Sequence, residues 1–258
     1  MLDFQNACTI HFRMDKDVDI AKAVRQHLEM EQFFTGFAVK GKTEAPEPRQ
    51  ERSDFPAANC VEELEKLVNE VRQCRKCELG SLRTNAVPGE GSPRARIMFV
   101  GEAPGADEDA QGRPFVGRAG QLLDRIIAAC GLKRSDVYIG NILKCRPPEN
   151  RDPRAEETIS CLPYLQRQIE AINPEIIVAL GAHAAKMLLN STKPIGQLRG
   201  QFHEYYAGFG RPPIKLMATF HPAYLLRNYV PENRKRVWED MKKVLAELGL
   251  PVPQQSKN

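Results

Sequence analysis

Four short apolar segments, separated by stretches of helical periodicity, constrain the fold of this 258-residue chain most strongly. In each of them nearly every residue is apolar, and we expect strands over residues 96–101, 137–141, 175–181 and 215–220. Strands that are apolar on both faces are typical of a parallel sheet covered by helices on both sides. The pattern therefore predicts an α/β domain.

Apolar residues between these segments recur every three to four positions, which indicates amphipathic helices. The expected helices are residues 60–73, a segment containing Leu122–Ile127 that ends near Gly131, residues 154–172 and a last helix containing residues 237–248. In an open parallel sheet, ligands bind beyond the carboxyl ends of the strands. The residues that follow the four strands are therefore the first candidates for a functional site.

The first 58 residues have a different character. Residues 19–31 have the pattern of one short helix, whereas residues 41–56 are rich in proline and charge and nearly devoid of large apolar side chains. Such a stretch cannot bury enough surface to offset its ordering entropy. We expect an N-terminal extension of unknown role (1–40), a linker (41–58), one main domain (59–250) and a short tail (251–258).

Composition excludes few functions. The net charge of +4 permits nucleic-acid binding without showing it. No apolar run approaches the roughly 20 residues that cross a bilayer, and the N-terminus lacks a secretory pattern. We expect a cytoplasmic protein with no membrane partner, whose cysteines are reduced unless they hold a metal.

Four of the seven cysteines suggest a metal site. Cys74 and Cys77 form a Cys-x-x-Cys pair after the first helix of the main domain, and Cys145 and Cys161 lie in a proline-rich loop and in the helix after it. Four thiolates form a closed coordination sphere that suits zinc or a [4Fe–4S] cluster. The spacing alone does not choose between them and leaves zinc as the default.

The first strand is followed by a glycine-rich stretch, Gly101-Glu-Ala-Pro-Gly105 and then residues 106–120. Its backbone amides can approach a ligand closely, and Gly117 and Gly120 are expected to open a helix N-terminus to an anionic group. The stretch matches neither the phosphate-binding loop nor the dinucleotide fingerprint. Phe115 fits a core plug better than an exposed stacking platform.

Asn141 follows the second strand and His221 the fourth. An asparagine side chain can pair with the edge of a pyrimidine, although many such residues only cap turns. His221 is preferred to the other histidines because Pro222 stops the strand and leaves His221 at its end. The others, which we interpret as structural, are His11, His27, His183 and His203.

Taken together, these segments resemble the family 4 uracil-DNA glycosylases, the iron–sulfur branch of that superfamily. The resemblance covers roughly residues 60–248 and rests on five elements in order: 101–105, 112–120, 141–148, 221–227 and the four cysteines. It implies a three-layer α/β/α fold with a four-stranded parallel sheet. It also implies a [4Fe–4S] cluster, held by the four cysteines, in place of zinc.

The resemblance further implies excision of uracil from single- or double-stranded DNA by a monomer, and a role for each matching residue. Glu102 would position the attacking water and His221 would hydrogen-bond uracil O2. Gly101, Ala103, Phe115 and Asn141 would bind the base, which reverses the preference for Phe115 as a plug. The residues that would contact DNA are Arg118, Lys144, Arg146, Leu225, Leu226 and Arg227.

Three departures from the family pattern are present. Ala223 replaces a common serine, Gly140 stands where threonine is usual, and residues 1–58 have no counterpart. No histidine lies between Asn141 and Cys161, which argues against a relative that binds uracil covalently. The alternatives are a non-catalytic iron–sulfur module that binds damaged DNA, and an electron-transfer protein.

Overall fold

The computed structural model describes residues 20–35, 37–38, 57–207 and 211–255. Its centre is a six-stranded sheet with the strand order β2-β4-β3-β5-β7-β6. The strands are β2 (Glu90–Gly91), β3 (Ile97–Gly101), β4 (Tyr138–Asn141), β5 (Ile176–Leu180), β6 (Phe202–Tyr205) and β7 (Ile214–Thr219). The four predicted strands are confirmed as the parallel centre, β4-β3-β5-β7. The antiparallel edge strands β2 and β6 were not predicted.

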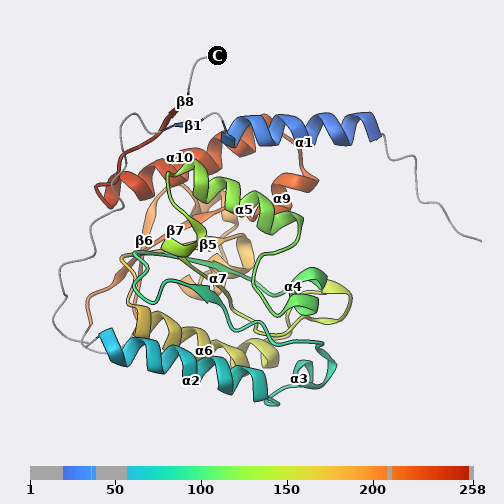
Figure 1. Cartoon of the computed structure of the whole chain (residues 1–258), viewed down its shortest axis with the longest axis vertical. Coiled ribbons are helices and arrows are strands. Elements are labelled where there is room, and N and C mark those ends of the chain that lie inside the picture. Colours follow the sequence, from blue (N-terminus) through green and yellow to red (C-terminus); the bar gives the residue numbers. More distant parts are fainter. Residues whose placement is uncertain (1–19, 36, 39–56, 208–210, 256–258) are drawn as a thin grey trace, which may run out of the picture.

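Helices cover both faces of the sheet and give the three predicted layers (Figure 1). One face carries α1 (Ile20–Thr35), α5 (Arg118–Ala129) and α10 (Pro231–Glu247), and the other carries α2 (Ala57–Gln73), α6 (Ala155–Ile172) and α7 (Ala182–Leu189). Short helices connect these layers: α3 (Leu79–Leu82), α4 (Ala106–Gln111), α8 (Ile195–Leu198), α9 (Pro222–Arg227), and the 3-10 turns η1 (Arg134–Asp136) and η2 (Pro148–Asn150).

The alternation of side chains along the strands divides the core into two clusters. Along β3, Met98 and Val100 pack towards α2 and α6, whereas Ile97 and Phe99 pack towards α5 and α10. All four side chains are at most 2% exposed. This double burial is the physical reason why the strands are continuously apolar in sequence.

The expected end of α5 is also confirmed. Gly131 adopts a left-handed conformation with φ of 75°, which glycine tolerates without steric cost. Its amide donates to the carbonyl oxygen of Ala128, and the amide of Leu132 donates to the carbonyl oxygen of Ile127.

The N-terminal extension contains a helix that packs on the main domain. α1 runs to Thr35, beyond the predicted 19–31, and its Met30 and Phe34 are buried in the core beside α5. After it, β1 (Phe37–Ala38) pairs with β8 (Gln254–Gln255) of the C-terminal tail. Residues 41–56 of the predicted linker lie outside the described residues.

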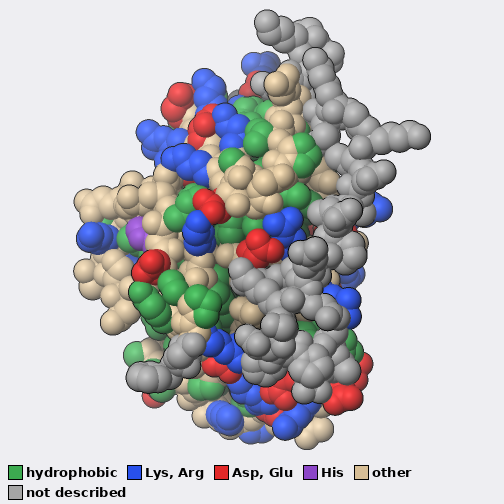
Figure 2. Space-filling view, turned by 90° about the vertical axis from the view of Figure 1, so that its left-hand side faces the viewer, with side chains coloured by type: hydrophobic (Ala, Val, Ile, Leu, Met, Phe, Trp, Pro, Cys, Tyr) green, Lys and Arg blue, Asp and Glu red, His purple; other side chains and the backbone are tan. Residues whose placement is uncertain are grey.

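Among the helices of the described part of the chain, none combines the length and apolar character that a membrane crossing requires. Figure 2 shows the side of the molecule away from α4 and α9. On that face Lys and Arg side chains alternate with Asp and Glu side chains. Its mixed charge does not mark a nucleic-acid surface.

Candidate active site and metal centre

The carboxyl ends of β3 and β4 form the floor of the candidate site. Gly101 and Asn141 are register partners in the parallel pair. Beyond them the chains stay joined, because the amide of Ile142 donates to the Gly101 carbonyl at 3.0 Å and the amide of Leu143 to the Glu102 carbonyl at 2.9 Å. The two predicted base-binding segments are therefore held side by side.

A side chain at Gly101 would displace its neighbours in the site. A Cβ atom there would lie 2.4 Å from Asn141 Oδ1 and 2.6 Å from Cζ of Phe115. Phe115 is only 6% exposed and lies in the core, as the sequence pattern without the family resemblance predicts. Its backbone adopts a left-handed conformation with φ of 51°. Its ring nevertheless faces the site, since it contacts the place where a Gly101 side chain would be.

Asn141 carries the most informative polar atom of the site. The residue is 2% exposed, and its Oδ1 atom is buried with no hydrogen-bond partner among the described residues. Leaving a buried acceptor unpaired costs roughly 1–3 kcal/mol. Such an atom points to a donor that the bound ligand supplies.

His221 is the N-cap of α9, and its protonation is set by its surroundings. Nδ1 accepts a hydrogen bond from the Ala223 amide at 3.1 Å, so the proton of the neutral ring is on Nε2. Burial, assisted by the positive charge of Arg227, lowers the pKa of His221 to about 4. Gly181, at φ of 93°, leaves room for this side chain, and the His221 ring lies 5.6 Å from the Phe115 ring. At neutral pH His221 can therefore donate from Nε2.

Glu102 has two neighbours that the sequence did not bring out. Nδ1 of His183, at the start of α7, lies 3.8 Å from Glu102 Oε1, and Asp152 offers a carboxylate within 4.8 Å of both. Burial raises the pKa of Glu102, the charge of His183 lowers it, Asp152 raises it and Arg227 lowers it. The structural interpretation of His183 is wrong in this respect, since the residue lies in the candidate site. His203 is structural as expected, with Nε2 2.7 Å from the Leu198 carbonyl oxygen.

The glycine-rich stretch is held from inside by Glu108. Its Oε1 accepts hydrogen bonds from the amides of Val116 and Gly117, at 2.8 and 3.0 Å, and its Oε2 from Gly105. A carboxylate of the chain itself therefore already pairs with the Gly117 amide. The amides of the first helical residues of α5 are not among the partners of Glu108, so the expected anion site at that helix N-terminus stays a prediction. Gly120 is needed for packing, since a Cβ there would lie 1.9 Å from the Phe115 carbonyl oxygen.

The predicted DNA-contact residues divide into surface and core. Arg118 and Arg227 are exposed, and Arg146 and Leu226 are half-buried. The prediction of DNA contact is wrong for two other residues. Leu225 is 1% exposed and packs in the core. Lys144 is also 1% exposed, and its Nζ donates to the carbonyl of Asn141 at 2.8 Å and to Oε1 of Gln168 at 2.6 Å. Neither side chain can reach DNA in this conformation.

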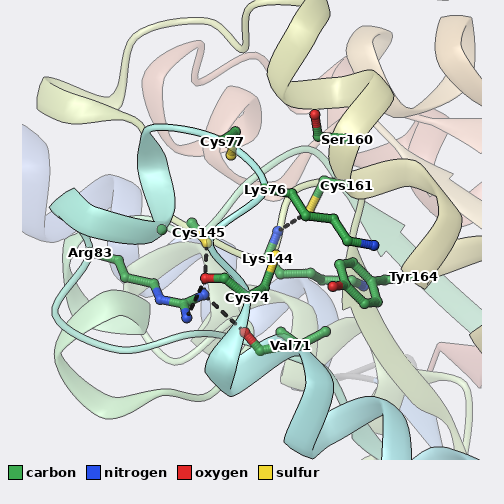
Figure 3. Close-up of a pocket in the computed structure, with 11 residues that line it drawn as sticks. Val71, Cys74, Lys76, Cys77, Arg83, Lys144, Cys145, Ser160, Cys161 and Tyr164 are labelled. Carbon is green, nitrogen blue, oxygen red and sulfur yellow. Dashed lines mark hydrogen bonds between the residues drawn. The ribbon is translucent and has the colours of Figure 1, made fainter.

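The four predicted cysteine ligands line one cavity between α2, α6 and the loop after β4 (Figure 3). Cys74 directly follows α2 and Cys77 lies three residues further on, whereas Cys145 comes from the loop and Cys161 from α6. Burial raises the pKa of the Cys161 thiol to about 11 and also raises that of Cys145.

Two N–H groups point at cysteine sulfurs, as is common around metal-bound thiolates. Nη1 of Arg83 donates to Cys145 Sγ at 3.0 Å, and the backbone amide of Lys144 donates to Cys161 Sγ at 3.2 Å. Arg83 also donates to the carbonyl oxygens of Val71, Arg72 and Cys74, so it ties the Cys-x-x-Cys segment to the Cys145 loop. Arg83 was not predicted, since a single arginine far from its partner in sequence gives no signal.

The distances between the sulfur atoms distinguish a single zinc ion from a larger iron–sulfur cluster. With Zn–S bonds of about 2.3 Å, four sulfurs around one zinc ion lie about 3.8 Å apart. Among the described residues, three or more donor atoms lie within 4.8 Å of one another only in Glu102, Asp152 and His183, and in no set of cysteines. The four thiols thus surround a space wider than a single zinc ion requires.

Comparisons with known proteins identify the family. The family model of the uracil DNA glycosylase superfamily matches residues 88–242. A type-4 uracil-DNA glycosylase of Saccharolobus solfataricus is 48% identical, over 71% of this chain and 86% of the relative. Those of Archaeoglobus fulgidus and Thermotoga maritima are 47% and 49% identical, over 71% and 70% of this chain and 92% and 93% of the relatives. The chain therefore belongs to the uracil-DNA glycosylase superfamily, in its type-4 branch.

Proposed function

We propose that this protein hydrolyses the N-glycosidic bond of uracil in DNA and leaves an abasic site. The observation that carries the proposal is the unpaired, buried Oδ1 of Asn141, which lies against Gly101 and Phe115 at the ends of β3 and β4. The similarity to type-4 uracil-DNA glycosylases supports the same activity. A non-catalytic module that binds DNA damage would need neither this atom nor a neutral His221.

Base recognition follows from the donor and acceptor pattern of the pocket. Uracil presents an N3–H donor beside the O4 acceptor, so Asn141 can accept from N3–H through Oδ1 and donate to O4 through its amino group. Cytosine presents an N3 acceptor beside an amino donor and would leave Oδ1 unpaired. The Phe115 ring would stack on the base, while Gly101 and Ala103 would let the backbone approach it.

The chemistry can be assigned to two side chains. A base inside a duplex is unreachable and has to flip out before it reacts. When the C1′–N1 bond breaks, its electron pair stays on uracil and positive charge develops on the sugar. His221, donating from Nε2, would stabilise the anion at O2, as oxyanion donors do for about 3–4 kcal/mol. The ionised Glu102 would orient the attacking water and face the cationic sugar.

The DNA backbone would meet the exposed arginines near the strand ends. Arg118 and Arg227, with the half-buried Arg146, supply positive charge for phosphates. Leu226 is the apolar side chain that can enter the gap left by the flipped base, because Leu225 remains in the core. Lys144 acts from inside, by holding the Asn141 carbonyl.

A [4Fe–4S] cluster held by Cys74, Cys77, Cys145 and Cys161 fits the donor set better than zinc. The support is the wide spacing of the sulfurs and the two N–H donors directed at them. When bound, the cluster would cross-link the end of α2, the loop after β4 and α6, and it would supply no reacting group. Lys144 connects this centre to the base pocket, because its amide contacts Cys161 and its ammonium contacts Asn141.

The proposal includes a monomer that works in the cytoplasm. Reduced thiols, which that compartment maintains, are needed to bind a cluster. The division into an extension, a linker, a main domain and a tail stays part of the proposal, with the change that α1 packs on the main domain.

The test is incubation of the full chain, with its cluster intact, with oligonucleotides that differ only in one base. The proposal predicts an alkali-labile abasic site in the uracil strand and none in the matched cytosine or thymine strands. No abasic product from uracil in either single- or double-stranded DNA would refute it.

A further inference from the structure

The N-terminal helix meets the main domain at the loop that follows α9. Tyr229 lies in this loop, two residues after Arg227, and its hydroxyl donates to Glu29 Oε2 of α1 at 2.7 Å. Arg234, in the first turns of α10, donates from Nη1 to the backbone carbonyl of Glu29 at 2.8 Å. One residue of α1 thus receives hydrogen bonds from the α9–α10 loop and from α10.

The ring contacts around Arg234 strengthen this junction. Its guanidinium lies 4.7 Å from the centre of the Tyr229 ring and 5.4 Å from that of Phe33 in α1. Arg234 is only 6% exposed, and a buried arginine retains its charge. A buried guanidinium needs partners. Arg234 has a carbonyl of α1 and two aromatic rings, while its buried Nε has no hydrogen-bond partner among the described residues.

α1 is fixed to the domain on its other sides as well. Met30 and Phe34 are buried beside α5, which in turn packs on α9. Phe37 of β1 lies 4.0 Å from the Trp238 ring of α10, ring centre to ring centre, and β1 pairs with β8. Figure 1 shows α1 running along the same side of the molecule as α9 and α10. The helix therefore has the anchorage to act as a rigid support.

We propose that α1 is a brace: it holds the α9–α10 junction in place, and with it Leu226 and Arg227, the side chains that would enter the duplex. The N-terminal extension is then a determinant of activity on double-stranded DNA. The inference rests on the proposed function. In a duplex, a side chain at the end of α9 has to enter the base stack and resist closure of the opened pair. In a single strand there is no pair to hold open, so a loose junction costs less. Glu29 and Tyr229 are thus positioning residues, acting through Leu226 and Arg227.

The experiment compares kcat/KM on double-stranded and single-stranded uracil DNA for the full-length protein and four variants: two single variants, their combination and a control. Tyr229→Phe keeps the ring and removes the hydroxyl, and Glu29→Ala removes the acceptor carboxylate while it keeps the backbone carbonyl. Gln32→Ala, at an exposed position of the same helix, is the matched control. Thermal unfolding and the visible absorbance of the cluster verify that each variant is folded.

The brace predicts that Tyr229→Phe and Glu29→Ala each lower kcat/KM on duplex DNA about fivefold, the effect of losing one solvent-exposed hydrogen bond, with less than a twofold change on single strands. The double variant should lose no more than the single ones, and Gln32→Ala should change neither substrate. Equal losses on both substrates, or no loss on either, would overturn the brace. An unmodified protein inactive on both substrates would instead refute the proposed function.

Discussion

At the scale of single residues, the candidate site is defined by a missing side chain, an unpaired hydrogen-bond acceptor and a neutral histidine. Gly101 has no side chain because Asn141 and Phe115 occupy that space. Oδ1 of Asn141 has no partner among the described residues, and His221 is kept neutral with its proton on Nε2. The unpaired Oδ1 costs stability in the absence of a ligand.

Replacing Gly101 by alanine should therefore block the pocket. The added Cβ would meet Asn141 Oδ1 and the Phe115 ring at 2.4 and 2.6 Å, so both groups would have to move. We expect kcat/KM on uracil DNA to fall about 100-fold or more, as when reacting groups lose their geometry. Gly196→Ala is the matched control, because a Cβ there meets no atom within 4 Å. Normal activity of Gly101→Ala would place the base elsewhere.

Glu102 gives the activity a defined pH dependence. The water-orienting role requires the carboxylate, so activity should fall as pH drops through the pKa of Glu102, which burial raises. The negative charge of Asp152 raises this pKa further and the positive charge of His183 lowers it. Asp152→Asn should therefore move the acid limb of the pH–rate profile to lower pH, and His183→Gln should move it to higher pH. If both variants shift the limb in the same direction, or neither shifts it, Glu102 does not control it.

At the scale of elements, what the sequence could predict depended on burial. The four central strands were predictable because burial on both faces makes them continuously apolar. The edge strands were not, since β2 has two residues and β6 mixes polar with aromatic side chains. Lys144 and Leu225 were assigned to the surface from the segments that contain them. Only the packing of α6 and α9 reveals that Lys144 is hydrogen-bonded to Asn141 and Gln168. The same packing shows that Leu225 lies in the core.

The loop between β4 and η2 connects the cysteine centre with the base pocket. Cys145→Ser and Cys161→Ser should reduce the visible absorbance of the cluster, lower the thermal unfolding temperature and abolish uracil excision together. The reason is that the loop that carries Cys145 begins directly after Asn141, and its Lys144 amide donates to Cys161 Sγ. Cys130→Ser is the control, since Cys130 is buried beside α5 on the other face of the sheet. A Cys145 or Cys161 variant that loses the absorbance but keeps full activity would contradict the connection.

At the scale of the whole molecule, the sheet brings together residues that lie far apart in the chain. Gly101, Asn141 and His221 come from different strand ends, and they were predictable as one site because the carboxyl ends of parallel strands share an edge. His183 and Asp152 were not, because no pattern distinguishes them from solvent-facing residues. The position of α1 was equally hidden, since it depends on contacts between residues about 200 positions apart, such as Glu29 and Arg234.

The most direct measurement is uracil excision by Asn141→Ala compared with the unmodified protein, with cluster absorbance recorded on the same samples. If Oδ1 of Asn141 reads the edge of uracil, the variant should keep its absorbance and its unfolding temperature while kcat/KM falls about 100-fold or more, since a site built to pair a polar group loses several kcal/mol without it. A folded, cluster-loaded Asn141→Ala protein that excises uracil at the unmodified rate would contradict this assignment.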